Sequence, residues 1–473
     1  MNIFFILLNT LLILIITEKL DNVESGNNDK YLEFSLERNY TLPKLISAEE
    51  LFKSLFYNQI YIKIRTGSQK IEIPFYLYLQ QYSFIIQSSE VSNDQVKGLY
   101  NELKSSTYIS SNKIDTFMVM DMSEGILSQD IFYLKNESLL DFYLCKKNND
   151  DTHITEGGKI GFKLEPENAQ SEEAFFITNL KHKNLISNLI FSILYDSGIN
   201  NDNDIGKLYI GTYPHIINNN KFKEKYLAMD YAAQIYTKIE WALNFQDIKL
   251  GNKLIETNCK AFLYLEIGYI IGTKNFFHYF LALNEWTKFY SANKCHKTKF
   301  KIDDYEKHLV DSKLTDEYTI YYCDKNVDIK KINIGELSFI DKSLSFEFNF
   351  SFAELWEEKN DYKYFKIIQH EYYNEYWYFG KPFFKKFQIV FDCDNKKVGL
   401  YTQIFEDGQN DDDKNKKNNI IIYILIIIGL VIIIAGLIIV LIKNYKKFTK
   451  RKRANELLDD NYDYETKEPK TIN

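Results

Sequence analysis

Short runs in which Ile, Tyr, Phe and Val alternate with polar residues dominate the interior of the chain. Such runs occupy residues 59–79, 207–213 and 337–352. Alternation with a period of two, in β-branched and aromatic residues, is typical of half-buried strands. Helical patterns are few, at 48–57, 172–189, 275–290 and 352–358. Many strands and few helices predict a mainly β fold.

Two apolar runs near the ends have a different pattern. Residues 2–17 form a short run followed by polar sequence, which predicts a signal peptide over 1–22, although a buried N-terminal helix or strand is the alternative. Residues 420–442 form a longer run with no charge. A helix of that length covers roughly 34 Å, more than the roughly 30 Å of a bilayer core, and this predicts a transmembrane helix.

The charges around the second run predict its orientation. Residues 443–453 contain seven Lys or Arg, whereas residues 411–417 mix three Asp with three Lys. The positive-inside rule then places a tail, 443–473, in the cytoplasm. Residues 404–419 are a polar linker, and the globular part is extracellular or lumenal, as in a single-pass type I membrane protein.

The remaining composition agrees with a secretory location and excludes some partners. The net charge is −7 and no basic stripe is interleaved with aromatics, so we expect no nucleic-acid partner. The five cysteines match no zinc spacing, so we expect neither a metal nor a cofactor. Glycosylation sequons occur at Asn39, Asn136 and Asn349.

Several segments resemble, in order, those of pepsin-like aspartic proteases. They are 59–73, with Thr66–Lys70 at the first turn; 99–111, with Ser105–Tyr108; 124–132; 157–164; 180–196 with 206–213; 241–251; and 376–402, which keeps Gly380, Phe383, Lys386, Phe391, Asp392, Asn395 and Gly399. The resemblance implies two β-rich lobes, at 50–215 and 225–403, facing across a cleft that binds an extended peptide.

The same resemblance implies one catalytic Asp in each lobe, and the first lobe has none at that place. Residues 73–89 contain no Asp or Glu. Counting from Gln69 puts Tyr76 at the catalytic position, and counting back from Ile85 puts Tyr78 there. A phenol, with an ordinary pKa near 10, does not replace a carboxylate at acidic pH.

In the second lobe two registers remain open. The gapless reading of residues 261–272 places Tyr264 at the catalytic position, and a shift of two residues places Glu266 there. A shift of two keeps every side chain on the same face, so the pattern alone does not choose between them. One acid still does not make the pair that shares a proton in this family.

Further positions follow from the resemblance. Asp121 lies near the place of the family's flap Tyr. The sequence Asp196-Ser197-Gly198 falls in a variable surface hairpin, so we expect no catalytic role for it. Relatives often carry a bridge where Cys295 and Cys323 lie, so we expect these to pair. Cys259 and Cys393 are a candidate second pair, which leaves Cys145 over.

The sequence therefore favours a membrane-tethered glycoprotein that kept the two-lobed frame and lost its acids, a catalytically degenerate pseudoprotease. It would bind an extended peptide or a protein, with the replacing tyrosines lining the cleft or packing as core. The alternative is an active aspartic-type endopeptidase with displaced acids, Glu266 together with Asp121 or Glu124. A purely structural surface glycoprotein is a third alternative.

Overall fold

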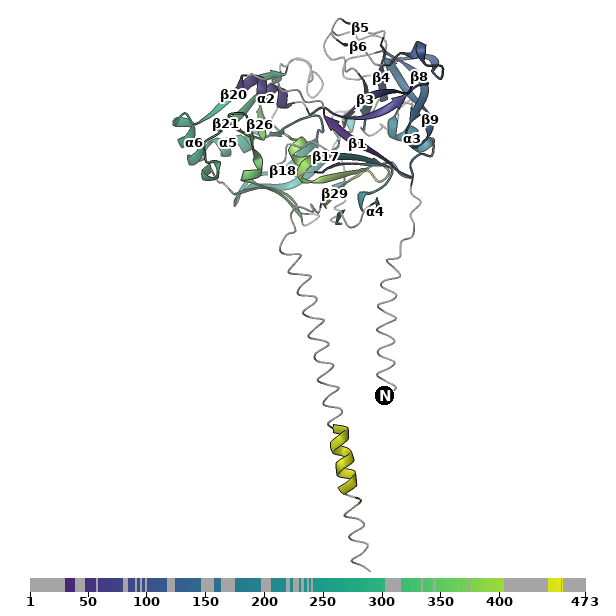
Figure 1. Cartoon of the computed structure of the whole chain (residues 1–473). Helices are drawn as coiled ribbons and strands as arrows, with labels where there is room; N and C mark the ends of the chain where they lie inside the picture. The colour runs from purple at the N-terminus through teal and green to yellow at the C-terminus, as the bar shows by residue number, and fades with distance from the viewer. Residues whose placement is uncertain are drawn as a thin grey trace, which may run out of the picture. The chain divides into compact units, whose positions relative to one another are not determined.

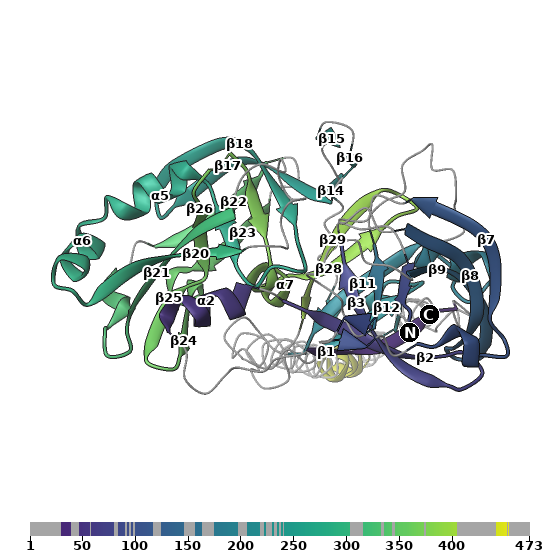
Figure 2. The same cartoon turned by 90° about the horizontal axis from the view of Figure 1, so that it is seen from above.

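The computed structural model describes residues 30–38, 47–56, 58–79, 84–89, 92–93, 96–97, 100–116, 124–145, 157–162, 175–196, 206–217, 222–223, 229–230, 234–235, 238–239, 241–302, 316–332, 335–342, 346–372, 375–403, 441–451 and 453. The chain divides into two units, residues 1–404 and 405–473. The first unit is mainly β, as the alternating runs predict, and it holds two large sheets (Figures 1 and 2).

The first sheet has 14 strands and forms the first lobe together with the strands between the lobes. Its main path runs β13-β29-β28-β11-β12-β1-β2-β3-β10-β4-β9-β8-β7. The strands are β1 (Leu32–Arg38), β2 (Ile60–Thr66), β3 (Ile71–Tyr78), β4 (Phe84–Gln87), β7 (Ile109–Thr116), β8 (Glu124–Tyr133), β9 (Glu137–Cys145), β10 (Gly158–Gly161), β11 (Ile190–Tyr195), β12 (Gly206–Ile210), β13 (Phe222–Lys223), β14 (Met229–Asp230), β28 (Gln388–Asp392) and β29 (Lys397–Gln403).

The second sheet has 11 strands and forms the second lobe. Its main path runs β23-β22-β17-β18-β27-β19-β26-β21-β25-β24, and β20 pairs with β21. The strands are β17 (Ala242–Leu250), β18 (Lys253–Leu263), β19 (Ile270–Gly272), β20 (Cys295–Ile302), β21 (Asp316–Asp324), β22 (Glu336–Asp341), β23 (Phe346–Ser351), β24 (Trp356–Lys359), β25 (Tyr362–Phe365), β26 (Ile367–His370) and β27 (Trp377–Phe379). Two short hairpins are separate: β5 (Ser92–Asn93) with β6 (Val96–Lys97), and β15 (Gln234–Ile235) with β16 (Lys238–Ile239).

Five consecutive strands repeat between the lobes with the same directions. β3 is parallel to β10, β10 antiparallel to β4, β4 parallel to β9, and β9 antiparallel to β8. β18, β27, β19, β26 and β21 follow the same alternation of parallel and antiparallel pairs. This repeat makes positions in one lobe directly comparable with positions in the other.

One hydrophobic core extends through both lobes. Trp241 precedes β17 and is fully buried, and its ring packs edge-on at 4.9 Å from Phe391 of β28 and at 6.2 Å from Phe191 of β11. Its indole N–H donates to the Phe162 carbonyl at 2.9 Å. The first residue of the second lobe is therefore fixed into the core of the first.

The helices agree only in part with the sequence patterns. α2 (Ala48–Phe56) matches its prediction closely, and α3 (Phe176–His182) is shorter than the predicted 172–189. The segment predicted as one helix over 275–290 is two, α5 (Lys274–Leu281) and α6 (Asn284–Ser291), because the chain is extended at Leu283. The short helices are α4 (Pro214–Ile217), α7 (Lys381–Lys386) and three 3-10 turns, at Glu102–Lys104, Ile329–Ile332 and Phe352–Leu355.

The helix predicted over 352–358 is wrong beyond Leu355, where β24 begins at Trp356. β1 was not predicted at all. It pairs with β12 along Leu32–Leu36 and reaches β2 at Glu37 and Arg38, so it joins the first sheet ahead of the resembling segments.

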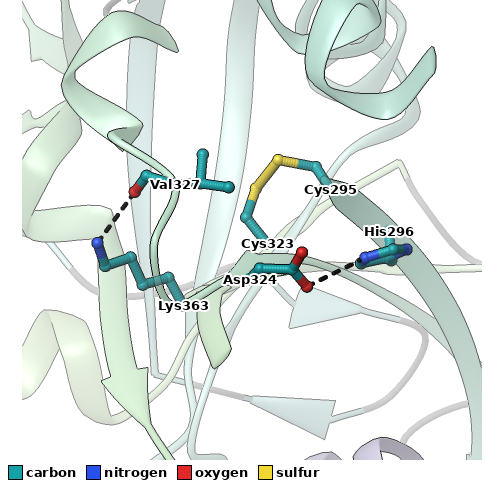
Figure 3. The surroundings of a disulfide bond; sticks show 6 residues. All are labelled: Cys295, His296, Cys323, Asp324, Val327 and Lys363. Carbon is teal, nitrogen blue, oxygen red and sulfur yellow. Dashed lines mark hydrogen bonds and ion pairs between the residues drawn. A yellow bond between two sulfur atoms is a disulfide. The ribbon is translucent and has the colours of Figure 1, made fainter. Parts of the chain in front are cut away.

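The predicted bridge between Cys295 and Cys323 is confirmed (Figure 3). The two cysteines are directly opposite each other in the antiparallel pair of β20 and β21. Beside them His296 Nε2 lies 3.3 Å from Asp324 Oδ1, and Lys363 Nζ donates to the Val327 carbonyl at 3.0 Å. Cys259 and Cys393 are not bridged, so the candidate second pair is wrong, and Cys145 is buried and forms no disulfide.

Candidate functional site

The site predicted from the sequence lies where β3 and β18 end. In the first lobe β10 pairs with β3, before the turn, and with β4, after it. In the second lobe β27 pairs in the same way with β18 and β19. Ile160 of β10 is opposite both Leu77 and Phe84, and Phe379 of β27 is opposite both Leu263 and Ile270. Leu77 and Phe84 are separated by the same number of residues as Leu263 and Ile270. The register therefore equates Leu77 with Leu263.

Counting from that pair gives the chemistry of each equivalent position. Tyr76 corresponds to Phe262, Tyr78 to Tyr264, and Gln80 to Glu266. Gln80 lies outside the described residues. Each of the catalytic positions that the sequence left open thus has an equivalent in the other lobe, and none of the three pairs contains two acids.

The tyrosines point away from the main core. Phe75, Leu77 and Leu79 belong to that core, so Tyr76 and Tyr78 lie on the opposite side of β3, which we call the far face. In the second lobe Leu263 is in the core and Tyr264 is on the far face. The exposed fractions of Tyr76, Tyr78 and Tyr264 are 7%, 4% and 4%. These phenols are packed rather than presented to solvent.

Glu266 is also buried, at 5% exposed, and it connects the lobes. Its Oε1 accepts a hydrogen bond of 2.8 Å from the backbone N–H of Leu79 in the first lobe. Its backbone carbonyl accepts from the N–H of Asn58 at 2.7 Å, and the Asn58 amide donates to the Leu265 carbonyl at 2.8 Å. Glu266, the acid that the structure describes at the candidate site, therefore supports the junction between the lobes.

Helix α2 covers the far face of the second lobe (Figure 2). Leu51, Phe52, Leu55 and Phe56 are buried in one cluster with Tyr264. This cluster also contains Phe262, Ile267, Tyr269, Ile271, Phe300, Ile302, Tyr318, Ile320, Tyr364 and Ile368. Their shared burial is the reason that Tyr264 has so little exposed surface.

Two phenylalanines of α2 make most of the ring contacts. The Phe52 ring lies 5.1 Å from Tyr322 and 5.7 Å from Tyr364. The Phe56 ring lies 4.9 Å from Tyr318 and 6.1 Å from Phe300. Tilted and edge-on pairs at these distances add to the stability that area burial supplies. These contacts involve three strands, β20, β21 and β25, so α2 is part of the second lobe's structure.

The backbone of α2 is fixed to the turn that carries the candidate positions. The N–H of Gly268 donates to the Phe56 carbonyl at 2.6 Å, and the Tyr269 hydroxyl donates to the Phe52 carbonyl at 3.1 Å. A Cβ at position 268 would lie 1.9 Å from the Leu55 carbonyl oxygen. Glycine is required there because the two backbones meet without room for a side chain.

Lys159 and Tyr61 lie next to the phenols of the first lobe. Lys159 of β10 is opposite Tyr76 in the register, and its Nζ lies 5.7 Å from the centre of the Tyr78 ring. The Tyr61 ring packs at a tilt against Tyr76, with the ring centres 5.4 Å apart. Burial, and then the hydrogen bond to Glu37, raises the pKa of Tyr61 above its ordinary value. Within the described part of the chain, no group of three His, Cys, Asp or Glu side chains is arranged to hold a metal ion.

The other predicted residues are distributed away from this junction. Asp121, Asn39 and Tyr82 lie outside the described residues, and so does the side chain of Glu124. Asp196 follows β11 on the surface. Asn136 is exposed in the turn between β8 and β9, whereas Asn349 is half-buried in the middle of β23. Glycosylation at these sites stays a prediction.

The remaining cysteines are held by their surroundings. The Cys259 thiol donates to Glu256 Oε2 at 3.1 Å, and burial together with that contact raises the pKa of the thiol. Glu256 also accepts from the Trp377 indole N–H at 2.9 Å. Burial, followed by the charges of Asp392 and Asp394, raises the pKa of Cys393. Neither thiol is poised as a nucleophile.

Sequence reasoning missed Asn58 and Leu79, which join the lobes, and the contact of Gly268 with α2. Their contribution is made by backbone groups, by the side-chain amide of Asn58 and by the absence of a Cβ, which leave no motif. The amphipathic pattern of residues 48–57 predicted a helix and gave no sign of where it packs.

Most of the predicted transmembrane run, 420–440, lies outside the described residues. Residues 441–451 are helical. Among the helices that the structure describes, none combines the length and the apolar character needed to cross a membrane.

Comparison with models of known protein families gives a match over most of the chain. The family model described as eukaryotic aspartyl protease matches residues 62–403, which include β2 through β29 and both turns of the candidate site. No curated protein matches the chain.

Proposed function

The chain belongs to the eukaryotic aspartyl protease family, and from that premise we propose that it is a non-catalytic, membrane-anchored binding protein. Its two-lobed domain would serve as an interaction module rather than as a peptidase. The single observation that carries the proposal is the equivalence of positions across the repeat, where no pair supplies two carboxyl groups.

The chemistry of the family explains why that observation matters. Two carboxyl groups that lie close together share one proton, because both cannot ionise, and this makes one a general base and the other a general acid. Tyr78 and Tyr264 are phenols on the far face of their strands and are almost fully buried. A buried phenol with an ordinary pKa near 10 stays protonated at acidic pH and activates no water.

The alternative of an active endopeptidase requires a second carboxyl group facing Glu266. Its equivalent in the first lobe is Gln80, an amide. In addition, Oε1 of Glu266 already accepts the Leu79 N–H, an interaction that stabilises the junction of the lobes. These features support loss of the reaction rather than displacement of the acids.

The partner that this arrangement favours is a protein surface. α2 covers the far face of the second lobe with its own Leu and Phe side chains, so an extended peptide would have to displace a packed helix there. The flanks outside this face are not restricted in that way. We therefore extend the proposal to recognition of a folded or surface-exposed protein partner rather than a peptide to be cut.

The membrane location is part of the proposal. It is supported by the apolar runs at 2–17 and 420–442 and by the excess of Lys and Arg after the second run. The three sequons and the disulfide agree with an oxidising, lumenal or extracellular environment for the globular part.

Peptide cleavage by the full chain in lipid nanodiscs tests the proposal. The assay uses a mixed peptide library from about pH 3 to about pH 7, with and without an inhibitor that mimics the tetrahedral transition state. The matched variant is Glu266→Gln, which keeps the size of the side chain and removes its charge. We expect no inhibitor-sensitive cleavage from either protein. Inhibitor-sensitive cleavage by the natural chain that is absent from the variant would contradict the proposal.

A further inference from the structure

The helix at residues 441–451 has side chains that contact little else. It is the yellow helix in Figure 1 and belongs to the second unit of the chain. Leu441, Tyr445 and Phe448 are 67%, 70% and 67% exposed. Large apolar side chains with this much exposed surface cost free energy in water unless something covers them.

The apolar and basic residues of this helix lie on opposite faces. Leu441, Tyr445 and Phe448 follow the spacing i, i+4, i+7, which places them on one face. Lys443, Lys446, Lys447 and Lys450 follow the spacing i, i+3, i+4, i+7 on the other face, and all four are exposed. Arg451 and Arg453 extend the basic side. A helix with one basic and one aromatic face is typical of segments that lie at a charged membrane surface.

The charge of the segment has one sign. No Asp or Glu occurs between Leu441 and Arg453, so the lysines have no acidic neighbour along the helix. From Lys443 to Lys450 the helix rises roughly 10 Å, which is about one Debye length at physiological salt. All four ammonium groups can therefore interact with the same charged surface.

We propose that this helix is a binding site for the headgroups of anionic phospholipids in the leaflet next to the chain. The inference rests on the proposed membrane anchoring, because the uncharged run of residues 420–440 directly precedes the helix. The lysines face the phosphate and carboxylate groups of the lipid, and Tyr445 and Phe448 lie at the level where aromatic side chains favour the interface. The polybasic segment would then enrich anionic lipid around the chain.

Spin-labelled lipids around the reconstituted full chain test this site. Vesicles of phosphatidylcholine with roughly one fifth phosphatidylserine contain a trace of either lipid carrying a spin label, and the fraction of motionally restricted label is measured. One variant replaces Lys443, Lys446, Lys447 and Lys450 with Gln. The matched control replaces Lys414, Lys416 and Lys417 with Gln, which removes charge on the other side of the apolar run.

The natural chain is expected to restrict labelled phosphatidylserine several-fold more than labelled phosphatidylcholine, and about 0.5 M added salt should reduce the difference. The difference should disappear in the four-lysine variant and remain in the control variant. Restriction of both lipids to the same extent by the natural chain would overturn the lipid site while leaving the membrane anchoring intact, and would direct attention to a soluble protein partner for the helix. Loss of the difference in both variants would also overturn it. Absence of any restricted lipid would refute the membrane anchoring itself.

Discussion

The far faces of the two lobes are formed by equivalent strands, but the side chains packed on them differ. In the first lobe Ile85, Leu127, Tyr143 and Cys145 form a small buried cluster on that face. In the second lobe the corresponding face belongs to a much larger cluster, which includes four residues of α2. Ile85 and Ile271 occupy equivalent places, since each directly follows one of the residues that the register equates, Phe84 and Ile270.

This difference shows that the same strand arrangement can carry different side chains, with different neighbours, at equivalent positions. The register gives Tyr78 and Tyr264 the same place, yet among the described residues it is Tyr264 that lies under a helix from outside the repeat. The second lobe also has the one acid, Glu266, whose carboxylate reaches across to Leu79. At the junction, Asn58 and Leu79 supply the donors, and the turn at Leu265 and Glu266 in the second lobe supplies the acceptors.

The largest effect expected is from removing an α2 anchor. Phe56 is fully buried, and Phe56→Ala should destabilise the second lobe by about 3–5 kcal/mol, as aromatic truncations in cores do. Hydrogen exchange should rise in residues 264–271 and much less in residues 75–78. Exposed Glu49 on the same helix gives a matched control, Glu49→Ala, for which we expect little change. Equal loss of protection in both lobes would show that α2 is not specific to the second.

The disulfide is a second asymmetry, because Cys295 and Cys323 are both in the second lobe. Replacing both with Ala should cost about 3 kcal/mol through the entropy of the unfolded chain. Heat unfolding followed by exchange in each lobe is the measurement, and the second lobe should lose protection at a lower temperature. Cys145→Ala, in the first lobe, removes a cysteine that forms no disulfide and serves as the comparison. A bridge that can be removed without lowering the unfolding temperature would contradict this account.

Substitutions of Glu266 test the hydrogen bond between the two lobes at their junction. Glu266→Ala leaves the buried Leu79 N–H without its acceptor, which should cost about 1–3 kcal/mol, whereas Glu266→Gln keeps an oxygen there and should cost less. The exchange rate of the Leu79 amide is the direct measurement. If that amide exchanges at the same rate in the natural chain and in the Ala variant, the hydrogen bond across the lobes has no role.

As the pH falls, the second lobe should lose stability before the first lobe does. We expect this effect to be smaller than those of the substitutions above. Burial alone would raise the pKa of Glu354, but the hydrogen bond and charge of Lys386, with the Ser351 N–H, outweigh it and hold the pKa below its ordinary value. Glu371 is lowered in the same way, against its burial, by Thr319 and Lys299. A depressed carboxyl pKa gives stability that is present above the unfolded pKa, near 4.5, and is lost as the pH falls through the folded pKa.

The measurement is the unfolding temperature as a function of pH, followed lobe by lobe. The decline below about pH 4.5 should be steeper for the second lobe. Glu354→Gln should flatten it, because the amide cannot titrate. Glu358→Gln is the control, since this carboxylate is more exposed in its ion pair with Lys325. A steeper decline in the first lobe would reverse the comparison.

The sequence predicted the architecture better than it predicted the contacts at the site. Alternating apolar residues identified the strands around 60–78 and 337–351, because burial on one face of a strand leaves a period of two. The pairing of Cys295 with Cys323 was also anticipated. The break between α5 and α6 was not, because the apolar positions continue through it while the backbone is extended at Leu283.

The contacts at the junction are of a kind that a single sequence does not reveal. Glu266 is recognisable as an acid, but its acceptance of the Leu79 N–H depends on how two segments far apart in the chain meet. The same holds for Gly268, whose missing Cβ matters only because Leu55 approaches it. The register between β18 and β27 makes Tyr264, and not Glu266, the equivalent of Tyr78 in the first lobe. The sequence pattern alone did not decide this, because a shift of two residues keeps every side chain on the same face of the strand.

Calorimetry of the full chain with a transition-state mimic, from about pH 3 to about pH 7, tests most directly whether a proton-sharing pair exists. The account predicts no binding heat and no proton uptake at any pH, for the natural chain and for Glu266→Gln alike. Binding that takes up a proton in the natural chain and disappears in the variant would contradict it.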